Sequence, residues 1–106
     1  MATETETIES KVSNYLKLLG KSANKVAESL KEKKIKGYRE NYNECPLAKG
    51  LEKAFKKSIK YGFSVDGGNI EFEYKNEYHS VKTPKACADF ITKFDDGEYP
   101  ELTLND

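Results

Sequence analysis

The sequence predicts an α+β domain: three N-terminal helices, a small antiparallel β-meander of two or three strands, and a C-terminal helix. Apolar residues first recur at helical spacing in three successive stretches that end near residue 60. Between residues 63 and 74 the apolar period changes to two, which is typical of strands with one buried face. A last stripe at helical spacing covers residues 87–94. Helices and strands that are grouped rather than alternating favour α+β over a parallel α/β fold.

Length and composition predict one domain. The chain has 106 residues, and we expect a single domain over 7–102, a disordered N-terminal tail at 1–6 and a short C-terminal tail at 103–106. No run approaches the roughly 20 apolar residues of a membrane span, and the acidic, polar start is unlike a secretory signal. Two cysteines beside an apolar core are typical of free thiols in a reducing compartment, although a single bridge stays open. We therefore expect a cytoplasmic protein without membrane contact, of bacterial or phage origin.

The first two helices follow from their stripes and caps. Helix one is expected over about 6–19, with Gly20 as a left-handed residue behind it. Ser22 is expected to cap a second helix that Gly37 closes. Residues 35–39 are either a short strand or an extended connection. The predicted buried positions are Ile8, Val12, Tyr15, Leu16 and Leu19 in helix one and Ala23, Val26, Ala27 and Leu30 in helix two.

A central helix is predicted over 46–60. Pro46 suits the first helical position, which makes Cys45 the N-cap, and Gly62 ends the segment. Gly50 inside this helix costs up to about 1 kcal/mol relative to alanine. One face carries the apolar residues Leu47, Leu51, Ala54, Phe55 and Ile59. Another face carries lysines at the same spacing, namely Lys49, Lys53, Lys56 and Lys60, with Lys57 beside them.

The meander is predicted from alternation and turn residues. Residues 66–69 (Asp-Gly-Gly-Asn) form a hairpin turn in which at least one residue, a glycine, is expected at positive φ. Asn76 marks a second turn. The sequence leaves open whether residues 78–82 form a third strand. The expected inward-facing strand residues are Phe63, Val65, Ile70, Phe72 and Tyr74.

The last helix is predicted to begin at Pro84, with Thr83 as its N-cap. Gly97 is the natural residue behind its C-terminus. Beyond it, Tyr99 and Leu102 are placed to fold back onto the core. Its buried stripe is expected to be Cys87, Phe90, Ile91 and Phe94.

Two motifs resemble a known family. Cys45-Pro46-Leu47-Ala48 is similar to a C-P-[LI]-A helix start, and residues 94–102 resemble an F-D-x-G-x-Y-P-E-L ending. Both features are found in a family of small, uncharacterised bacterial proteins. The resemblance covers roughly residues 22–102, and it implies no activity.

Charge is unevenly distributed although the total is zero. Residues 25–60 carry a net charge of +6, and residues 66–106 carry −6. One interpretation is internal complementarity between packed halves, which we favour because solvated lysine faces are common on helices. The other is a basic surface for an anionic partner.

The candidate interaction surface is the lysine face together with nearby cationic and aromatic residues. Its members are Lys49, Lys53, Lys56, Lys57, Lys60, Arg39, Tyr38 and Tyr42. This mixture is typical of nucleic-acid surfaces. However, arginine occurs only once and the pI is about 6.6, which makes nucleic-acid binding the alternative rather than the first expectation.

Enzymatic and metal chemistry have little support in the sequence. Cys45 is the candidate reactive thiol, because a helix N-terminus favours the thiolate. Its only possible histidine base is His79, and nothing in the spacing brings the two together, so we favour a structural cap. The acidic residues near 95–101 lack calcium-loop spacing, and two distant cysteines with one histidine do not make a zinc site. We expect no catalytic residue, no metal and no cofactor.

These observations predict a small non-enzymatic adaptor or regulator that binds another protein. The alternatives are a nucleic-acid-binding regulator and a phage or mobile-element inhibitor of host machinery. The sequence leaves the partner and the oligomeric state open.

Overall fold

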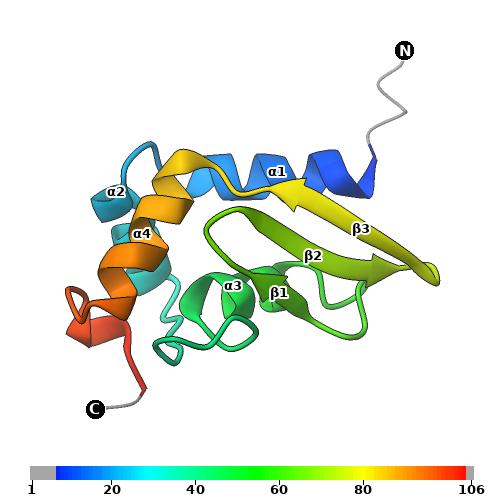
Figure 1. Cartoon of the computed structure of the whole chain (residues 1–106). Helices are drawn as coiled ribbons and strands as arrows, with labels where there is room; N and C mark the ends of the chain where they lie inside the picture. The colour runs from blue at the N-terminus through cyan, green and yellow to red at the C-terminus, as the bar shows by residue number, and fades with distance from the viewer. Residues whose placement is uncertain (1–6, 105–106) are drawn as a thin grey trace.

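The computed structural model describes residues 7–104, so the tail expected at residues 1–6 and residues 105–106 lie outside this range. Within it the chain forms four α-helices, a three-stranded sheet and a short 3₁₀ helix (Figure 1). The α+β fold class predicted from the sequence is confirmed. The elements are α1 (Ile8–Leu19), α2 (Ala23–Glu32), α3 (Pro46–Ala54), β1 (Phe63–Val65), β2 (Asn69–Tyr74), β3 (Glu77–Lys82), α4 (Lys85–Asp95) and η2 (Pro100–Leu102).

Side-chain caps define the starts of α1 and α2. The Thr7 hydroxyl accepts the Ser10 N–H at 3.0 Å, and the Ser22 hydroxyl accepts the Lys25 N–H at 3.2 Å. Gly20 follows the last residue of α1 as predicted and has a positive φ of 155°, but its ψ of 164° lies outside the left-handed helical region. A Cβ at this position would lie only 2.5 Å from the Lys25 Cβ, so close approach of α2 explains the glycine.

The end of α2 differs from the prediction. The helix ends at Glu32 rather than near Gly37, and Lys34 behind it has a φ of 60°. The Ile35 N–H bonds to the Leu30 carbonyl, and the Lys34 N–H bonds to that of Lys31. This hydrogen-bond pattern ends a helix while placing an apolar residue against its last turn. Ile35 is thereby buried at 6% exposure, which explains why the chain turns before Gly37.

The central helix is shorter than predicted. α3 ends at Ala54, and Phe55 has non-helical angles, φ −115° and ψ 20°. The N–H groups of Ser58 and Ile59 then both bond to the Phe55 carbonyl. This turn brings Ile59 into the core at 3% exposure, so burial has overridden the helical pattern of the sequence. The predicted helix over 46–60 is therefore wrong beyond residue 54.

The three strands form an antiparallel meander in the order β1-β2-β3, which confirms the third strand. Phe63 faces Phe72, and Ile70 lies between Val65 on β1 and Val81 on β3. The second turn is Lys75–Asn76, with φ of 52° and 66°. Positive φ at both central residues is the type I′ pattern that matches strand twist.

The first hairpin turn does not use positive φ. The glycines with positive φ in the described chain are Gly20, Gly62 and Gly97, so this prediction for residues 66–69 is wrong. Instead, the Asp66 Oδ1 accepts the N–H groups of Gly68 at 2.7 Å and Asn69 at 2.8 Å. An aspartate that bonds to the backbone two and three residues ahead forms the turn without glycine geometry.

α4 begins one residue later than predicted. Pro84 rather than Thr83 is the N-cap, and the Thr83 hydroxyl donates to the Asp66 carbonyl at 2.8 Å. The C-terminus agrees with the prediction, because Gly97 has a φ of 88° and closes the helix. Beyond it, Tyr99 and Leu102 are buried as expected.

The first residues of the expected C-terminal tail are attached to the α2–α3 connection. Thr103 forms a β-bridge with Gly37, and the Leu104 N–H donates a hydrogen bond to the Gly37 carbonyl. The 35–39 segment is therefore an extended connection that makes one bridge.

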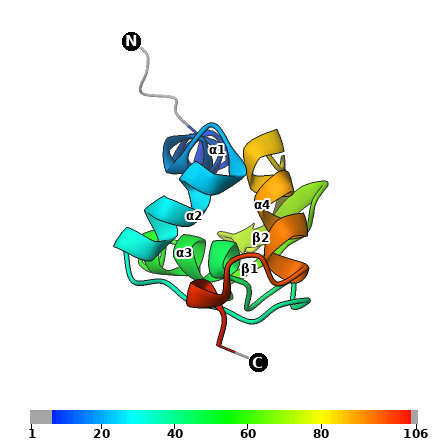
Figure 2. The ribbon, with the colours of Figure 1, turned by 90° about the vertical axis from the view of Figure 1, so that its left-hand side faces the viewer.

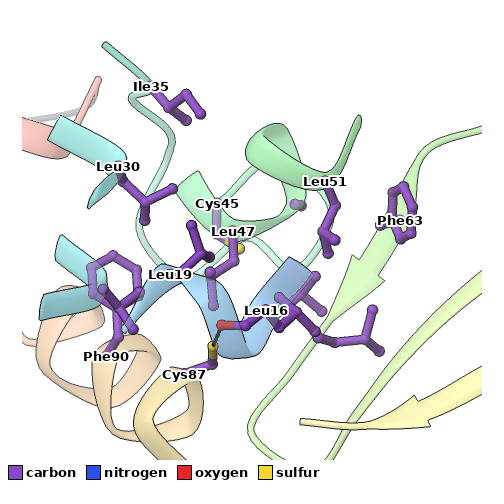
Figure 3. Packing of buried hydrophobic residues seen from close by; sticks show 14 of the residues in the cluster. Leu16, Leu19, Leu30, Ile35, Cys45, Leu47, Leu51, Phe63, Cys87 and Phe90 are labelled. Atoms are coloured by element: carbon purple, nitrogen blue, oxygen red, sulfur yellow. Dashed lines mark hydrogen bonds between the residues drawn. The ribbon is translucent and has the colours of Figure 1, made fainter. Parts of the chain in front are cut away.

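The core lies between the helices and one face of the sheet. α2 packs against α4, α1 runs beside β3, and α3 packs against β1 (Figures 1 and 2). Figure 3 shows Leu16, Leu30, Leu47 and Phe90 converging from four helices. The Cys87 Sγ donates a long hydrogen bond, 3.9 Å, to the Leu16 carbonyl in this interior.

Candidate interaction surfaces

The predicted lysine surface is not one face of one helix. Lys53 is exposed on α3, but Lys49 is half-buried, contrary to the expectation that it would be solvated. Lys56 and Lys57 are exposed in the turn that follows α3, and Lys60 lies beyond that turn. Because α3 ends at Ala54, helical spacing no longer aligns the later lysines with the earlier ones.

The remaining members of the predicted surface lie elsewhere. The Nη1 atom of Arg39 is 3.2 Å from the position that a Cβ on Gly97 would take, which places Arg39 at the end of α4. Tyr38 is half-buried on the α2–α3 connection, and its N–H bonds to the Glu44 carbonyl. Tyr42 is 64% exposed and lines a different hollow from Lys53. The structure thus divides the predicted surface into separate sites.

One hollow combines lysines with an apolar floor. It has a volume of about 300 Å³ and is formed by α1, the end of α2 and α3. We call it the basic groove; its lining residues are Tyr15, Lys33, Ile35, Gly50, Lys53 and Ala54. Lys33 and Lys53 are both exposed, and they are the only charged residues in the lining. A ligand here would meet positive charge above apolar carbon.

Local structure explains how this groove forms. The left-handed turn at Lys34 directs Ile35 inward and leaves Lys33 at the end of α2. Gly50 leaves room for Tyr15, since a Cβ there would lie 3.2 Å from the tyrosine oxygen. The Tyr15 hydroxyl donates to the Gly50 carbonyl at 3.3 Å, and its ring packs edge-on against Phe55. The floor is therefore positioned by contacts between α1 and α3.

A second, smaller hollow continues the apolar surface. It has a volume of about 170 Å³ and shares Tyr15 and Lys33 with the basic groove. Its lining also contains Leu18, which is 84% exposed, the most exposed large apolar residue in the described chain. Leu18 therefore adds exposed apolar area next to the basic groove.

Cys45 occupies the N-cap position of α3, but its environment does not favour reactivity. The thiol is 5% exposed and makes no side-chain capping hydrogen bond. Burial raises the pKa of the Cys45 thiol and outweighs the lowering effect of the Ala48 and Leu47 N–H groups, and the Asp95 carboxylate raises it further. Burial of the thiol therefore supports the structural cap favoured from the sequence over the reactive-thiol alternative. Burial also raises the pKa of the Cys87 thiol, to about 11.

His79 is engaged at another part of the molecule. Its Nδ1 lies 2.8 Å from the Glu9 Oε2, which connects β3 to the first turn of α1. Its ring stacks on Phe72 with centroids 5.5 Å apart. The hollow that Cys45 lines does not include His79, so the structure does not assemble a thiol–imidazole pair there.

The lysines of the predicted surface are not neutralised internally. Among residues 7–104, no ion pair joins Lys49, Lys53, Lys56, Lys57 or Lys60 to an acidic residue. The internal charge complementarity favoured from the sequence is thus not realised as direct contacts of these lysines. Within the same range no cluster of three His, Cys, Asp or Glu side chains is arranged to hold a metal ion.

Sequence reasoning missed Leu18 as a member of a surface, and it included Lys33 only as one of the lysines upstream of the central helix. Leu18 directly precedes Leu19, which belongs to the buried stripe of the first helix. A leucine outside that stripe was the signal that could have predicted an exposed apolar residue. Lys33 was one of several lysines after α2, and only the position of the helix end distinguishes it.

The comparisons with known proteins give no relative. No family model matches the chain, and neither a curated protein nor a solved structure matches it. The resemblance to a bacterial family through its two motifs therefore stays a prediction. No helix among residues 7–104 is long and apolar enough to cross a membrane.

Proposed function

We propose that this protein is a small non-enzymatic adaptor or regulator that binds another protein through the basic groove. The supporting observation is the combination of two exposed lysines with an apolar floor and the neighbouring, highly exposed Leu18. A partner segment that satisfies both features is an amphipathic helix or extended strand with apolar side chains flanked by Asp or Glu.

The residues that line the groove favour a protein partner over a nucleic acid. Phosphate backbones need many cations along a track, and base recognition relies mostly on arginine and exposed aromatic rings. The groove has two lysines, and its one aromatic residue, Tyr15, is half-buried with its hydroxyl directed to the Gly50 carbonyl. Burial of apolar side chains over Ile35 and Ala54 suits a polypeptide better. A nucleic-acid-binding regulator stays the alternative, and an inhibitor of host machinery would be one form of the protein-binding role.

The test is capture of a partner from the native host, followed by binding measurements with that purified partner. The double variant Lys33→Gln/Lys53→Gln removes the two groove cations and should weaken binding by about two- to thirtyfold, since rim charges contribute roughly 0.2–1 kcal/mol each. Leu18→Ala removes exposed apolar area and should weaken binding by about tenfold. The matched control Lys75→Gln/Lys82→Gln removes two exposed sheet lysines and should bind like the unaltered protein.

Two further outcomes would contradict the proposal. If the groove variants retain full affinity while melting normally, the partner binds elsewhere. If the unaltered protein instead binds single-stranded DNA or RNA with affinity that falls steeply between 50 and 200 mM salt, and Leu18→Ala has no effect, the nucleic-acid alternative is correct.

A further inference from the structure

The hollow above Cys45 is distinct from the basic groove in both position and charge. It has a volume of about 290 Å³ and lies where the α2–α3 connection, the first hairpin turn and α4 meet. Three carboxylates border it, from Glu40, Asp66 and Asp95, and its lining contains no Lys, Arg or His. We call it the acidic pocket.

The apolar side chains that a ligand can reach in the acidic pocket are those of Ile91 and Tyr42. Ile91 is half-buried and Tyr42 is 64% exposed. The lining residues Val65, Phe90 and Phe94 are each at most 2% exposed, and the two phenylalanine rings stack with centroids 5.6 Å apart, so they form a rigid base rather than a contact surface. Ligand sites are mostly apolar and pre-formed, and the volume of about 290 Å³ is just below their usual range of about 300–1,000 Å³. It therefore suits one or two side chains better than a large ligand.

Backbone contacts position two of the bordering carboxylates. The Asp95 Oδ1 accepts the Glu40 N–H at 2.8 Å, which connects α4 to the α2–α3 connection. The Asp66 Oδ1 accepts two N–H groups of the hairpin turn. These N–H groups lower the pKa of Asp66 and so favour its charged form. The negative charge at the pocket is thus fixed in place before any ligand arrives.

We propose that the acidic pocket binds a basic peptide segment of a partner protein, with one apolar side chain against Ile91 and Tyr42 and flanking Lys or Arg side chains against the three carboxylates. Like charges that border one apolar hollow repel each other, and a cationic segment relieves that repulsion while it covers these two side chains. An acidic or uncharged segment would bury the same apolar area without this gain. The site is independent of the basic groove, and two sites of opposite charge would let the protein bridge two partners.

The test uses a pentapeptide with phenylalanine between two pairs of lysines and the ¹⁵N-labelled full chain. Saturable shifts of the amide signals of Gly67, Ile91 and Asp95 are expected. A peptide with glycine in place of phenylalanine should bind at least about tenfold more weakly, because a buried aromatic side chain contributes about 1.5–3 kcal/mol. A peptide with glutamates in place of the lysines should cause no saturable shift.

Matched variants separate local from overall charge. Glu40→Gln/Asp95→Asn removes two charges but keeps oxygen acceptors for the backbone, and it should weaken binding by about two- to thirtyfold. Glu98→Gln/Glu101→Gln removes two charges outside the pocket lining and should stay within twofold of the unaltered protein. If the first variant melts at a lower temperature, Glu40→Gln alone and Asp66→Asn alone replace it, each with an expected loss of about two- to threefold.

Several results would overturn the proposal. The first is that the phenylalanine peptide causes no saturable shifts at millimolar concentration. The second is that the glycine peptide binds as tightly as the phenylalanine peptide. The third is that both charge variants lose the same affinity for the phenylalanine peptide. Lys33→Gln/Lys53→Gln should bind the pentapeptide like the unaltered protein. Failure at this pocket and failure at the basic groove are thereby distinguishable.

Discussion

The Tyr15 hydroxyl donates a hydrogen bond to the Gly50 carbonyl at 3.3 Å, and this contact joins α1 to α3 beneath the basic groove. The tyrosine ring also packs edge-on against Phe55, with centroids 5.8 Å apart. Two separate contributions therefore hold the same side chain, one polar and one apolar. Substitutions that remove them one at a time can measure each.

We expect Tyr15→Phe to cost only about 0.5 kcal/mol of unfolding free energy. The hydrogen bond is long, and a neutral hydrogen bond contributes about 0.5–1.5 kcal/mol net. Tyr15→Ala also removes the ring and should cost about 2–3 kcal/mol, below the range for a fully buried aromatic because Tyr15 is half-buried. Urea denaturation of both variants measures the difference. Equal losses would show that the ring contact contributes little.

The two cysteines should respond differently to serine. Cys45 occupies a helix N-cap, where a serine hydroxyl can accept a first-turn N–H, so Cys45→Ser should change the unfolding free energy by less than about 1 kcal/mol. Cys87 is fully buried, and the acceptor of its hydrogen bond, the Leu16 carbonyl, is 3.9 Å away. A serine oxygen there lacks a partner at normal distance, so Cys87→Ser should cost about 1–3 kcal/mol. Thermal melts of the two variants give the comparison, and a larger loss for Cys45→Ser would contradict it.

The stability of the first hairpin should depend on pH through Asp66. The backbone N–H groups of Asn69 and Gly68 lower its pKa in the folded state from the ordinary value of 3.8. Stabilisation from this group is therefore present above about pH 4 and is lost as the pH falls through the folded-state pKa. Asp66→Asn keeps an oxygen acceptor but cannot titrate. Between pH 6 and pH 2.5 the unaltered protein should lose more unfolding free energy than this variant, and parallel losses would show that Asp66 does not contribute.

Local patterns in the sequence predicted most of the elements. The stripes of α1, α2 and α4 and the alternation of β2 are complete within each segment, so periodicity alone predicts most of their buried residues. Of the predicted positions in these elements, Ile8, Tyr15, Tyr74 and Ile91 are only partly buried. Prediction failed where two segments compete for the core. Phe55 and Ile59 fit a helical stripe, but they reach the interior through a turn once α1 and the sheet are in place. No pattern within residues 46–60 predicts that the helix ends at Ala54 and that a turn follows.

The same limit explains why the candidate sites were only partly predicted. Lys53, Tyr42 and Cys45 were all selected from the sequence, but the structure assigns Lys53 to one hollow and the other two to another. The acidic pocket combines Glu40, Asp66 and Asp95 from three distant segments, so only the tertiary fold brings their charges together. The uneven distribution of charge along the chain favoured internal complementarity and left a basic surface as the alternative, so it did not predict an acidic pocket.

The last prediction concerns Lys34, which ends α2 with a φ of 60°. A residue with a Cβ pays about 1–2 kcal/mol in this left-handed region, whereas glycine does not. Glycine also has more conformational freedom in the unfolded chain, which offsets part of the gain. Lys34→Gly should therefore raise the unfolding free energy by about 0.5–1 kcal/mol. The neighbouring Lys33 has a φ of −83° and is the matched control, because Lys33→Gly gives up conformational entropy without relieving strain and should lower stability. Urea midpoints of the two variants should move in opposite directions. A fall for both would show that Lys34 does not hold a strained conformation at the end of α2.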